Sequence, residues 1–153
     1  MKVEFVLNGK EVEFDVDPGK VLLDLLRENG HKSVKAGCKT GDCGACMVLV
    51  DGRAMTSCTL YAAQVDGKEV KTVEGLEDEL ADRLKESLLE AGAVQCGFCI
   101  PGVLVSAYSL LSKVENPSRD EIKAALDGNL CRCTGYVKQI DAIKETAKSL
   151  GGS

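Results

Sequence analysis

Residues 37–46 read Gly-Cys-Lys-Thr-Gly-Asp-Cys-Gly-Ala-Cys, and this loop decides how the first half of the chain folds. It carries Cys38, Cys43 and Cys46, and Cys58 follows after a further strand-like stretch. Three glycines and one alanine lie among these cysteines, and glycine adopts backbone angles that turn several N–H groups toward one centre. Four thiols around such a loop indicate a metal-containing site.

The spacing of these four cysteines favours one kind of site. Cys-x4-Cys-x2-Cys with one distant cysteine is the plant-type ferredoxin arrangement for a 2Fe-2S cluster. We therefore expect Cys38, Cys43, Cys46 and Cys58 to bind such a cluster. Structural zinc is the main alternative, but its signature is paired Cys-x2–4-Cys elements, and only one such pair occurs here. A disulfide is a more distant third.

Four further cysteines lie in the second half of the chain. Cys96 and Cys99 precede a segment with helical spacing, and Cys131 and Cys133 follow another. Residues 99–102, Cys-Ile-Pro-Gly, would direct free N–H groups and the positive end of a helix dipole toward an anionic cluster. From spacing alone this set also fits a zinc ribbon. The Cys-x-Cys pair and the neighbouring iron–sulfur loop favour a second 2Fe-2S cluster.

Strand patterns surround the first cysteine set. Alternating residues over 2–16, interrupted by an Asn-Gly pair, predict a hairpin, and residues 47–57 around an Asp-Gly pair predict another. A helix is expected over 21–27 and a short strand over 69–73. The first half is thus predicted to be an α+β unit, mostly strands with one crossing helix.

Helical periodicity begins near residue 77. Four helices are expected, over 79–91, 101–112, 118–127 and 140–149. Pro101 suits a first helical turn, and Ser118 with Glu121 forms a capping box. We expect two domains, residues 1–76 and 77–153, the second being all-α. The terminal Gly151-Gly152-Ser153 is interpreted as a frayed end or an expression scar without function.

Composition excludes several function classes. The 153 residues include 19 Lys+Arg and 24 Asp+Glu, a formal charge of -5, so neither nucleic acid nor an anionic membrane is an expected partner. The N-terminal residues show no leader or anchor pattern, and eight thiols with no such leader indicate the cytoplasm. His31 follows Gly30 in an expected loop and is interpreted as a solvated residue. No catalytic base and no phosphate-binding loop is recognisable.

Four motifs together carry a family resemblance. They are residues 37–46, residues 58–60 (Cys-Thr-Leu), residues 95–102 (Gln-Cys-Gly-Phe-Cys-Ile-Pro-Gly) and residues 129–136 (Asn-Leu-Cys-Arg-Cys-Thr-Gly-Tyr). They closely resemble the small iron–sulfur subunit of the molybdenum hydroxylases, a family that includes xanthine, nicotinate and carbon monoxide dehydrogenases, aldehyde oxidoreductases and 4-hydroxybenzoyl-CoA reductases. The resemblance spans nearly the whole chain, and all eight ligand positions of the family are filled.

The resemblance implies a ferredoxin-like β-grasp domain followed by a four-helix domain with pseudo-twofold symmetry, each binding one 2Fe-2S cluster. It further implies that the helical-domain cluster lies nearest a molybdenum-pterin cofactor in a large partner subunit, and that the other cluster passes electrons outward, often to FAD in a third subunit. The residue at Gln95 would contact the pterin, and Cys133 would lie near its amino group. From the residues alone, Gln95 is a surface amide beside a ligand.

We thus expect a subunit without catalytic residues that relays electrons during substrate hydroxylation, with xanthine or another purine as the expected substrate. A free-standing two-cluster ferredoxin is the alternative, although a simple carrier needs only the first ~75 residues. A zinc-stabilised interaction module is a third hypothesis.

Overall fold

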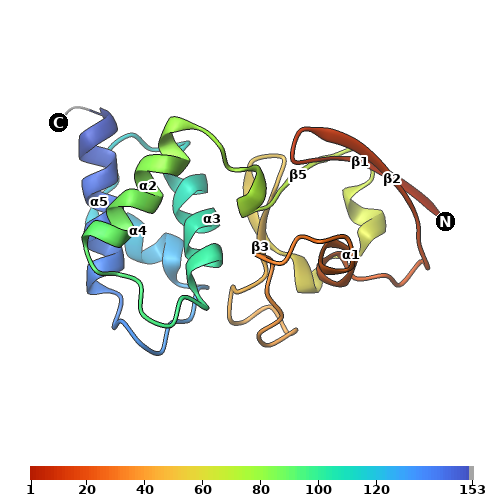
Figure 1. The fold of residues 1–153 in the computed structure, drawn as a ribbon, viewed down its shortest axis with the longest axis horizontal. Coiled ribbons are helices and arrows are strands. Elements are labelled where there is room, and N and C mark those ends of the chain that lie inside the picture. Colours follow the sequence, from red (N-terminus) through yellow and green to blue (C-terminus); the bar gives the residue numbers. More distant parts are fainter. Residues whose placement is uncertain (152–153) are drawn as a thin grey trace.

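The computed structural model describes residues 1–151. A five-stranded mixed sheet with strand order β2-β1-β5-β3-β4 forms the first half of the chain (Figure 1). Strand β1 pairs with β5 in parallel, whereas the other neighbours are antiparallel. The elements of this half are β1 Lys2–Leu7, β2 Lys10–Asp15, α1 Leu22–Glu28, β3 Met47–Val50, β4 Arg53–Thr56 and β5 Glu69–Lys71, with 3-10 turns at Ser57–Thr59, Ala62–Val65 and Val73–Gly75.

Both predicted hairpins are present. Asn8 and Gly9 have φ of 51° and 82°, and Asp51 and Gly52 have φ of 48° and 80°. Two successive positive φ values are what a tight two-residue hairpin turn requires. Helix α1 packs its buried leucines into the core beneath the sheet, together with Val3, Val48 and Val70. The α+β prediction for this half is therefore confirmed.

Four helices form the second half. They are α2 Glu79–Glu90, α3 Ile100–Leu111, α4 Arg119–Leu126 and α5 Val137–Gly151. The predicted capping box of α4 is present, because the Ser118 hydroxyl accepts from Glu121 N–H and the Glu121 carboxylate accepts from Ser118 N–H. Pro101 lies in the first turn of α3, as expected.

The predicted start of the last helix was wrong by three residues. Helix α5 begins at Val137 rather than at residue 140, because Gly135 and Tyr136 both have positive φ and end the preceding loop there. Gly151 is the last residue of α5 and is not frayed from it. The interpretation of Gly152 and Ser153 concerns residues outside the described range.

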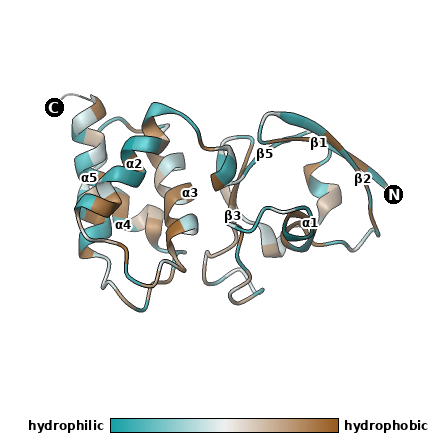
Figure 2. Ribbon diagram, in the orientation of Figure 1, coloured by the Kyte–Doolittle hydropathy of each residue, from teal (hydrophilic) through white to brown (hydrophobic). Residues whose placement is uncertain are grey.

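The sheet and the helices meet through a small apolar cluster. Leu49 of β3, Leu76 before α2, Ala81 of α2 and Val105 of α3 are all buried in it. Helix α3 lies against β3 and β4 on one side and against α2 and α4 on the other, and its ribbon carries much of the hydrophobic colour in Figure 2. The start of β1 and helix α5 lie at opposite ends of the long axis (Figure 1).

Within residues 1–151, no helix is long and apolar enough to cross a membrane. The domain boundary at residue 76 stays a prediction, since the segment that it divides packs against both halves.

Candidate iron–sulfur sites

The first cysteine loop directs backbone N–H groups at its sulfurs. Cys38 Sγ accepts from the N–H groups of Thr40 and Asp42 at 3.3 Å each and of Cys43 at 3.4 Å. Ala45 N–H donates to Cys43 Sγ at 3.5 Å. Such bonds stabilise thiolates, which are the form that binds metal. The loop is therefore built around sulfur anions before any cofactor is considered.

Glycines permit this loop for two different reasons. Gly41 and Gly44 have φ of 85° and 74°, values that residues with a side chain rarely adopt. Gly37 has no such angle, but a Cβ there would lie 2.5 Å from Cys43 Sγ. The sequence argument from φ thus applies to two of the three glycines, while the third provides room for a sulfur.

Cys46 and Cys58 form the inner part of this site. Cys46 is buried, and Cys58 reaches it from the turn that follows β4. Burial, and then the adjacent Cys46 thiol, raises the pKa of Cys58 to about 11. In contrast, the Thr40 hydroxyl and the backbone N–H groups lower the pKa of Cys38 to about 5. Cys38 thus favours the thiolate form even without a metal, whereas Cys58 favours the neutral thiol until a metal binds.

The second set of cysteines lies just before α3 and in the loop that precedes α5. Cys99 is the N-cap residue of α3 and is buried beside Cys131, and burial followed by that neighbour raises the Cys99 pKa to about 11. Burial acts to raise the pKa of Cys131 too, but hydrogen bonds from Thr134 outweigh it and lower that pKa to about 7. Cys96 and Cys133 are exposed and lie next to each other.

Polar side chains support this second site. Cys131 N–H donates to the Tyr136 hydroxyl at 2.7 Å, and Thr134 Oγ1 lies 3.1 Å from Cys131 Sγ. Gln139, which is fully buried on α5, donates from Nε2 to Cys99 Sγ at 3.4 Å. Its Oε1 atom has no hydrogen-bond partner among residues 1–151. The buried amide of Gln139 therefore makes its hydrogen bond to a thiol.

A single metal ion and a two-iron cluster place different demands on the thiols. Neighbouring thiols come in pairs, Cys46 with Cys58, Cys99 with Cys131 and Cys96 with Cys133. Nowhere in residues 1–151 do three or more His, Cys, Asp or Glu side chains gather as one metal ion would require. A tetrahedral zinc site needs four ligands around one point, whereas a 2Fe-2S cluster takes two thiolates on each of two irons.

Backbone contacts join the two cysteine loops. Leu130 N–H, next to Cys131, donates to the Cys43 carbonyl at 2.9 Å. A Cβ at Gly44 would lie 2.2 Å from the Gly128 carbonyl oxygen, and one at Gly102 would lie 2.2 Å from the Gly44 carbonyl oxygen. The two sites are therefore held at a short and fixed separation by main-chain packing.

The remaining predicted residues lie as follows. Gln95 is exposed and precedes the exposed Cys96. His31 is not fully solvated, because its Nδ1 lies 3.4 Å from Asn8 Nδ2. It contacts an amide rather than any thiol. Sequence reasoning missed Gln139 and Lys35, whose amine reaches the carbonyls between Cys96 and Cys99. An earlier start for α5 would have placed Gln139 in the same buried stripe as Ile143 and Thr146, but nothing in the sequence indicates that its amide reaches a thiol.

Comparison with known families gives two matches. A family described as a 2Fe-2S iron-sulfur cluster binding domain matches residues 5–81, and one described as a 2Fe-2S binding domain matches residues 72–144. Each match contains one of the two cysteine sets.

Several known proteins are similar to this chain over nearly the whole length of both sequences. The nicotinate dehydrogenase small FeS subunit of Eubacterium barkeri is 48% identical over 90% of this chain and 89% of the relative. The xanthine dehydrogenase iron-sulfur-binding subunit of Escherichia coli O157:H7 is 43% identical over 96% and 94%. The crystal structure of quinoline 2-oxidoreductase from Pseudomonas putida 86 superposes with a TM-score of 0.91 at 43% identity, covering 99% of this chain and 96% of the other.

Proposed function

The chain belongs to the family of small iron–sulfur subunits of the molybdenum hydroxylases, and from that premise we propose how it works within an oxidoreductase. It is the electron-transfer subunit, carrying two 2Fe-2S clusters and acting with larger partner subunits. The proposal is that it accepts electrons from a molybdenum-pterin site in one partner and delivers them to FAD in another.

The proposed ligands are the eight cysteines. Cys38, Cys43, Cys46 and Cys58 would bind one cluster, and Cys96, Cys99, Cys131 and Cys133 the other. Each cluster supplies one-electron redox chemistry when bound. The observation that carries the proposal is the cage of N–H groups around Cys38 Sγ, because a buried core cysteine would not collect three backbone donors.

The chain's own residues set the conditions for this chemistry. N–H groups of the loops donate to sulfur and thereby stabilise negative charge there. Ala45, Cys46 and Cys99 are buried, which keeps water from the inner sulfurs. No residue of the chain is proposed to abstract a proton or to contact the substrate.

The partner-facing surface is proposed to be the one around Cys96 and Cys133. These thiols are exposed in the isolated chain, and the apolar side chains of Phe98, Leu130 and Val137 are 47%, 58% and 56% exposed near them in sequence. A redox site covered by a partner subunit would explain both exposures. Gln95 would then contact the pterin from this surface.

Substrate choice lies in the partner subunit. Because the relatives named above act on nicotinate and xanthine, we favour a nitrogen heteroaromatic ring, with xanthine or another purine first. Assay of the assembled complex against xanthine, nicotinate and an aldehyde separates these possibilities. The proposed compartment is the cytoplasm, where thiols stay reduced.

Metal analysis of the full chain, prepared without oxygen, tests the function. We expect about four irons and four acid-labile sulfides per chain and two EPR signals on reduction. Zinc in their place without sulfide would overturn the proposal. Cys58→Ser should remove the signal of the first site and leave that of the second, since no ligand is shared. A chain that purifies from native extract without larger subunits would favour a free-standing ferredoxin.

The role of Gln95 has its own test. Gln95→Ala should leave both EPR signals intact but slow turnover of the assembled complex by about tenfold, as expected on losing an outer-shell hydrogen bond to a cofactor. Leu89→Ala, a truncation on the exposed face of α2, is the control. Equal turnover of both variants and the parent would remove Gln95 from the site.

A further inference from the structure

Lys35 belongs to the sheet half of the chain but ends in the helical half. Its backbone N–H donates to the Ala45 carbonyl at 3.0 Å, inside the first cysteine loop. Its amine donates to the carbonyls of Gly97 at 3.2 Å and Phe98 at 3.3 Å. It also lies 4.9 Å from the centroid of the Phe98 ring. One half-buried lysine thus contacts both cysteine sites, the first through its backbone and the second through its amine.

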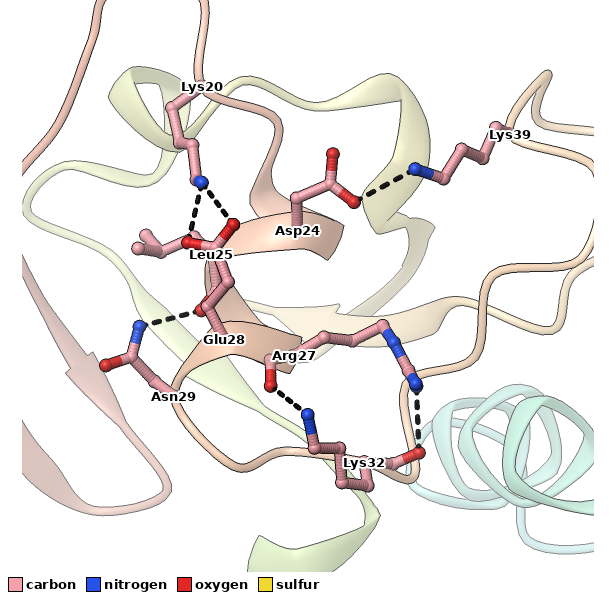
Figure 3. Close-up of polar contacts among 8 residues, drawn as sticks. All are labelled: Lys20, Asp24, Leu25, Arg27, Glu28, Asn29, Lys32 and Lys39. Atoms are coloured by element: carbon pink, nitrogen blue, oxygen red, sulfur yellow. Dashed lines mark hydrogen bonds and ion pairs between the residues drawn. The ribbon is translucent and has the colours of Figure 1, made fainter.

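The segment before Lys35 is tied down by α1. Arg27 donates to the carbonyls of Lys32 at 3.3 Å and Val34 at 2.8 Å, and Lys32 donates back to the Arg27 carbonyl at 2.6 Å (Figure 3). Val34 is buried. The amine of Lys35 therefore reaches across from an anchored backbone rather than from a loose loop.

The charge of Lys35 is not neutralised by a carboxylate. Among residues 1–151 no Asp or Glu oxygen lies within ion-pair distance of its amine. Lys39, which lies in the first cysteine loop, differs because it pairs with Asp24 at 3.1 Å (Figure 3). Lys35 thus presents to the turn between Cys96 and Cys99 a positive charge that has no carboxylate partner in the described part of the chain.

The hydrogen bonds of Lys35 also orient that turn. In a trans peptide the C=O and N–H groups point in opposite directions. Because the Gly97 carbonyl faces Lys35, the N–H of Phe98 points away from the lysine. The lysine therefore acts on the second site twice, by its own charge and by the peptide dipole that it aligns.

We propose that Lys35 is a positioning residue for the second cluster, and that its cation raises the reduction potential of that cluster from the neighbouring domain. The inference rests on the proposed function. Reduction adds one negative charge to an already anionic group, and a nearby cation stabilises the reduced form more than the oxidised form. The potential of the helical site thus depends on its contact with the sheet half.

Redox titration of the full chain, followed by the two EPR signals, tests this role. The Cys58→Ser variant identifies which signal belongs to the helical site. Lys35→Met keeps most of the side-chain length and removes the charge. We expect the reduction equilibrium constant of the helical cluster to fall about tenfold, which is 59 mV for one electron. Lys35→Arg, which keeps the charge, should stay within about threefold of the parent.

Lys39→Met is the matched control, because its charge is already paired with Asp24. It should leave the helical signal within about twofold of the parent. The proposal is overturned if Lys35→Met keeps both clusters and the parent potential, or if Lys35→Arg falls as far as Lys35→Met. Should Lys35→Met lose iron, Lys35→Gln, which retains an N–H donor, must show the same fall. Absence of both clusters from the parent chain would overturn the proposed function, and this inference with it.

Discussion

Gln139 shows how a single buried side chain is committed to the second site. Its Nε2 donates to Cys99 Sγ at 3.4 Å, while its Oε1 is buried with no partner in the described part of the chain. An unsatisfied buried carbonyl costs on the order of 1–3 kcal/mol. Because an aliphatic side chain at this position would avoid that cost, we expect the N–H to sulfur bond to serve the cysteine site rather than stability.

Replacing Gln139 by Leu should therefore separate potential from stability. We expect the reduction potential of the helical-domain cluster to fall, because a donor to its Cys99 ligand is lost. The Tm should stay equal or rise, because the unsatisfied oxygen is removed as well. EPR-monitored redox titration and thermal melting measure the two effects.

Thr146→Val is the control for Gln139. Thr146 is buried on the same helix, and its hydroxyl donates to the Ala142 carbonyl rather than to a thiol. It should leave the potential unchanged. A Gln139→Leu variant with an unchanged potential and a lowered Tm would show that Gln139 is a packing residue only.

The limits of sequence reasoning are visible at this scale. Cysteine spacing alone predicts both four-cysteine sets, because a metal centre fixes the number and separation of its ligands. Lys35 and Gln139 carry no comparable signal. Each reaches a cysteine site from a distant part of the chain, so only the folded structure brings them there.

At the scale of elements, short-range rules succeed where the determinant is local. The Asn8-Gly9 and Asp51-Gly52 turns and the Ser118 capping box were predicted, since each depends on a few consecutive residues. The start of α5 was not, because it depends on the left-handed backbone of Tyr136, a residue type that rarely adopts it.

Glycines allow the first cysteine loop to pack closely against α3, either by adopting a positive φ or by leaving out a Cβ. Alanine substitutions separate these two effects. Gly52→Ala meets only an unfavourable φ of 80°, with nothing within 4 Å. Gly102→Ala has an ordinary φ but would lie 2.2 Å from the Gly44 carbonyl oxygen, and Gly44→Ala combines a φ of 74° with a 2.2 Å approach to Gly128.

We expect the free energy of unfolding to fall by about 1 kcal/mol for Gly52→Ala, by about 1–3 kcal/mol for Gly102→Ala, and by more for Gly44→Ala than for either. Denaturant titration of the full chain by circular dichroism measures the order. A Gly102→Ala variant as stable as the parent would show that α3 can move away from the first cysteine loop without cost.

At the scale of the whole molecule, the segment between the halves is tied to both of them by carboxylates. Glu74 accepts from the Ser33 N–H at 3.1 Å and from the Ser33 hydroxyl, on the sheet side. Asp78 accepts from Ala81 N–H at 2.8 Å and from the Tyr108 hydroxyl of α3. The arrangement of sites that electron transfer requires thus depends on ionised groups as well as on the apolar cluster.

The pKa values of these groups set the pH range in which the ties act. Burial works to raise the pKa of Asp78, but hydrogen bonds from Tyr108 and Ala81 outweigh it and lower that pKa below the ordinary 3.8. The stability that Asp78 contributes is therefore present above its unfolded pKa and is lost as pH falls through the lower, folded value. Burial, and then Asp78, raises the pKa of Tyr108 to about 12 from 10.0. Its contribution is complete below pH 10 and is lost as pH rises through about 12.

A double-mutant cycle with Tyr108→Phe and Asp78→Asn should reveal this dependence. At pH 7 we expect a coupling of about 1 kcal/mol, the lower range for a partly exposed hydrogen bond to a charged group. It should shrink below pH 4, as Asp78 becomes protonated, and again above pH 11, as Tyr108 ionises. Any acid damage to the clusters is expected to be equal in the parent, the two single variants and the double variant, so that it cancels in the cycle. A coupling that stays constant from pH 3 to pH 7 would show that the Asp78 charge does not stabilise the junction, which would then depend on its uncharged contacts, such as the packing around Leu76 and Val105.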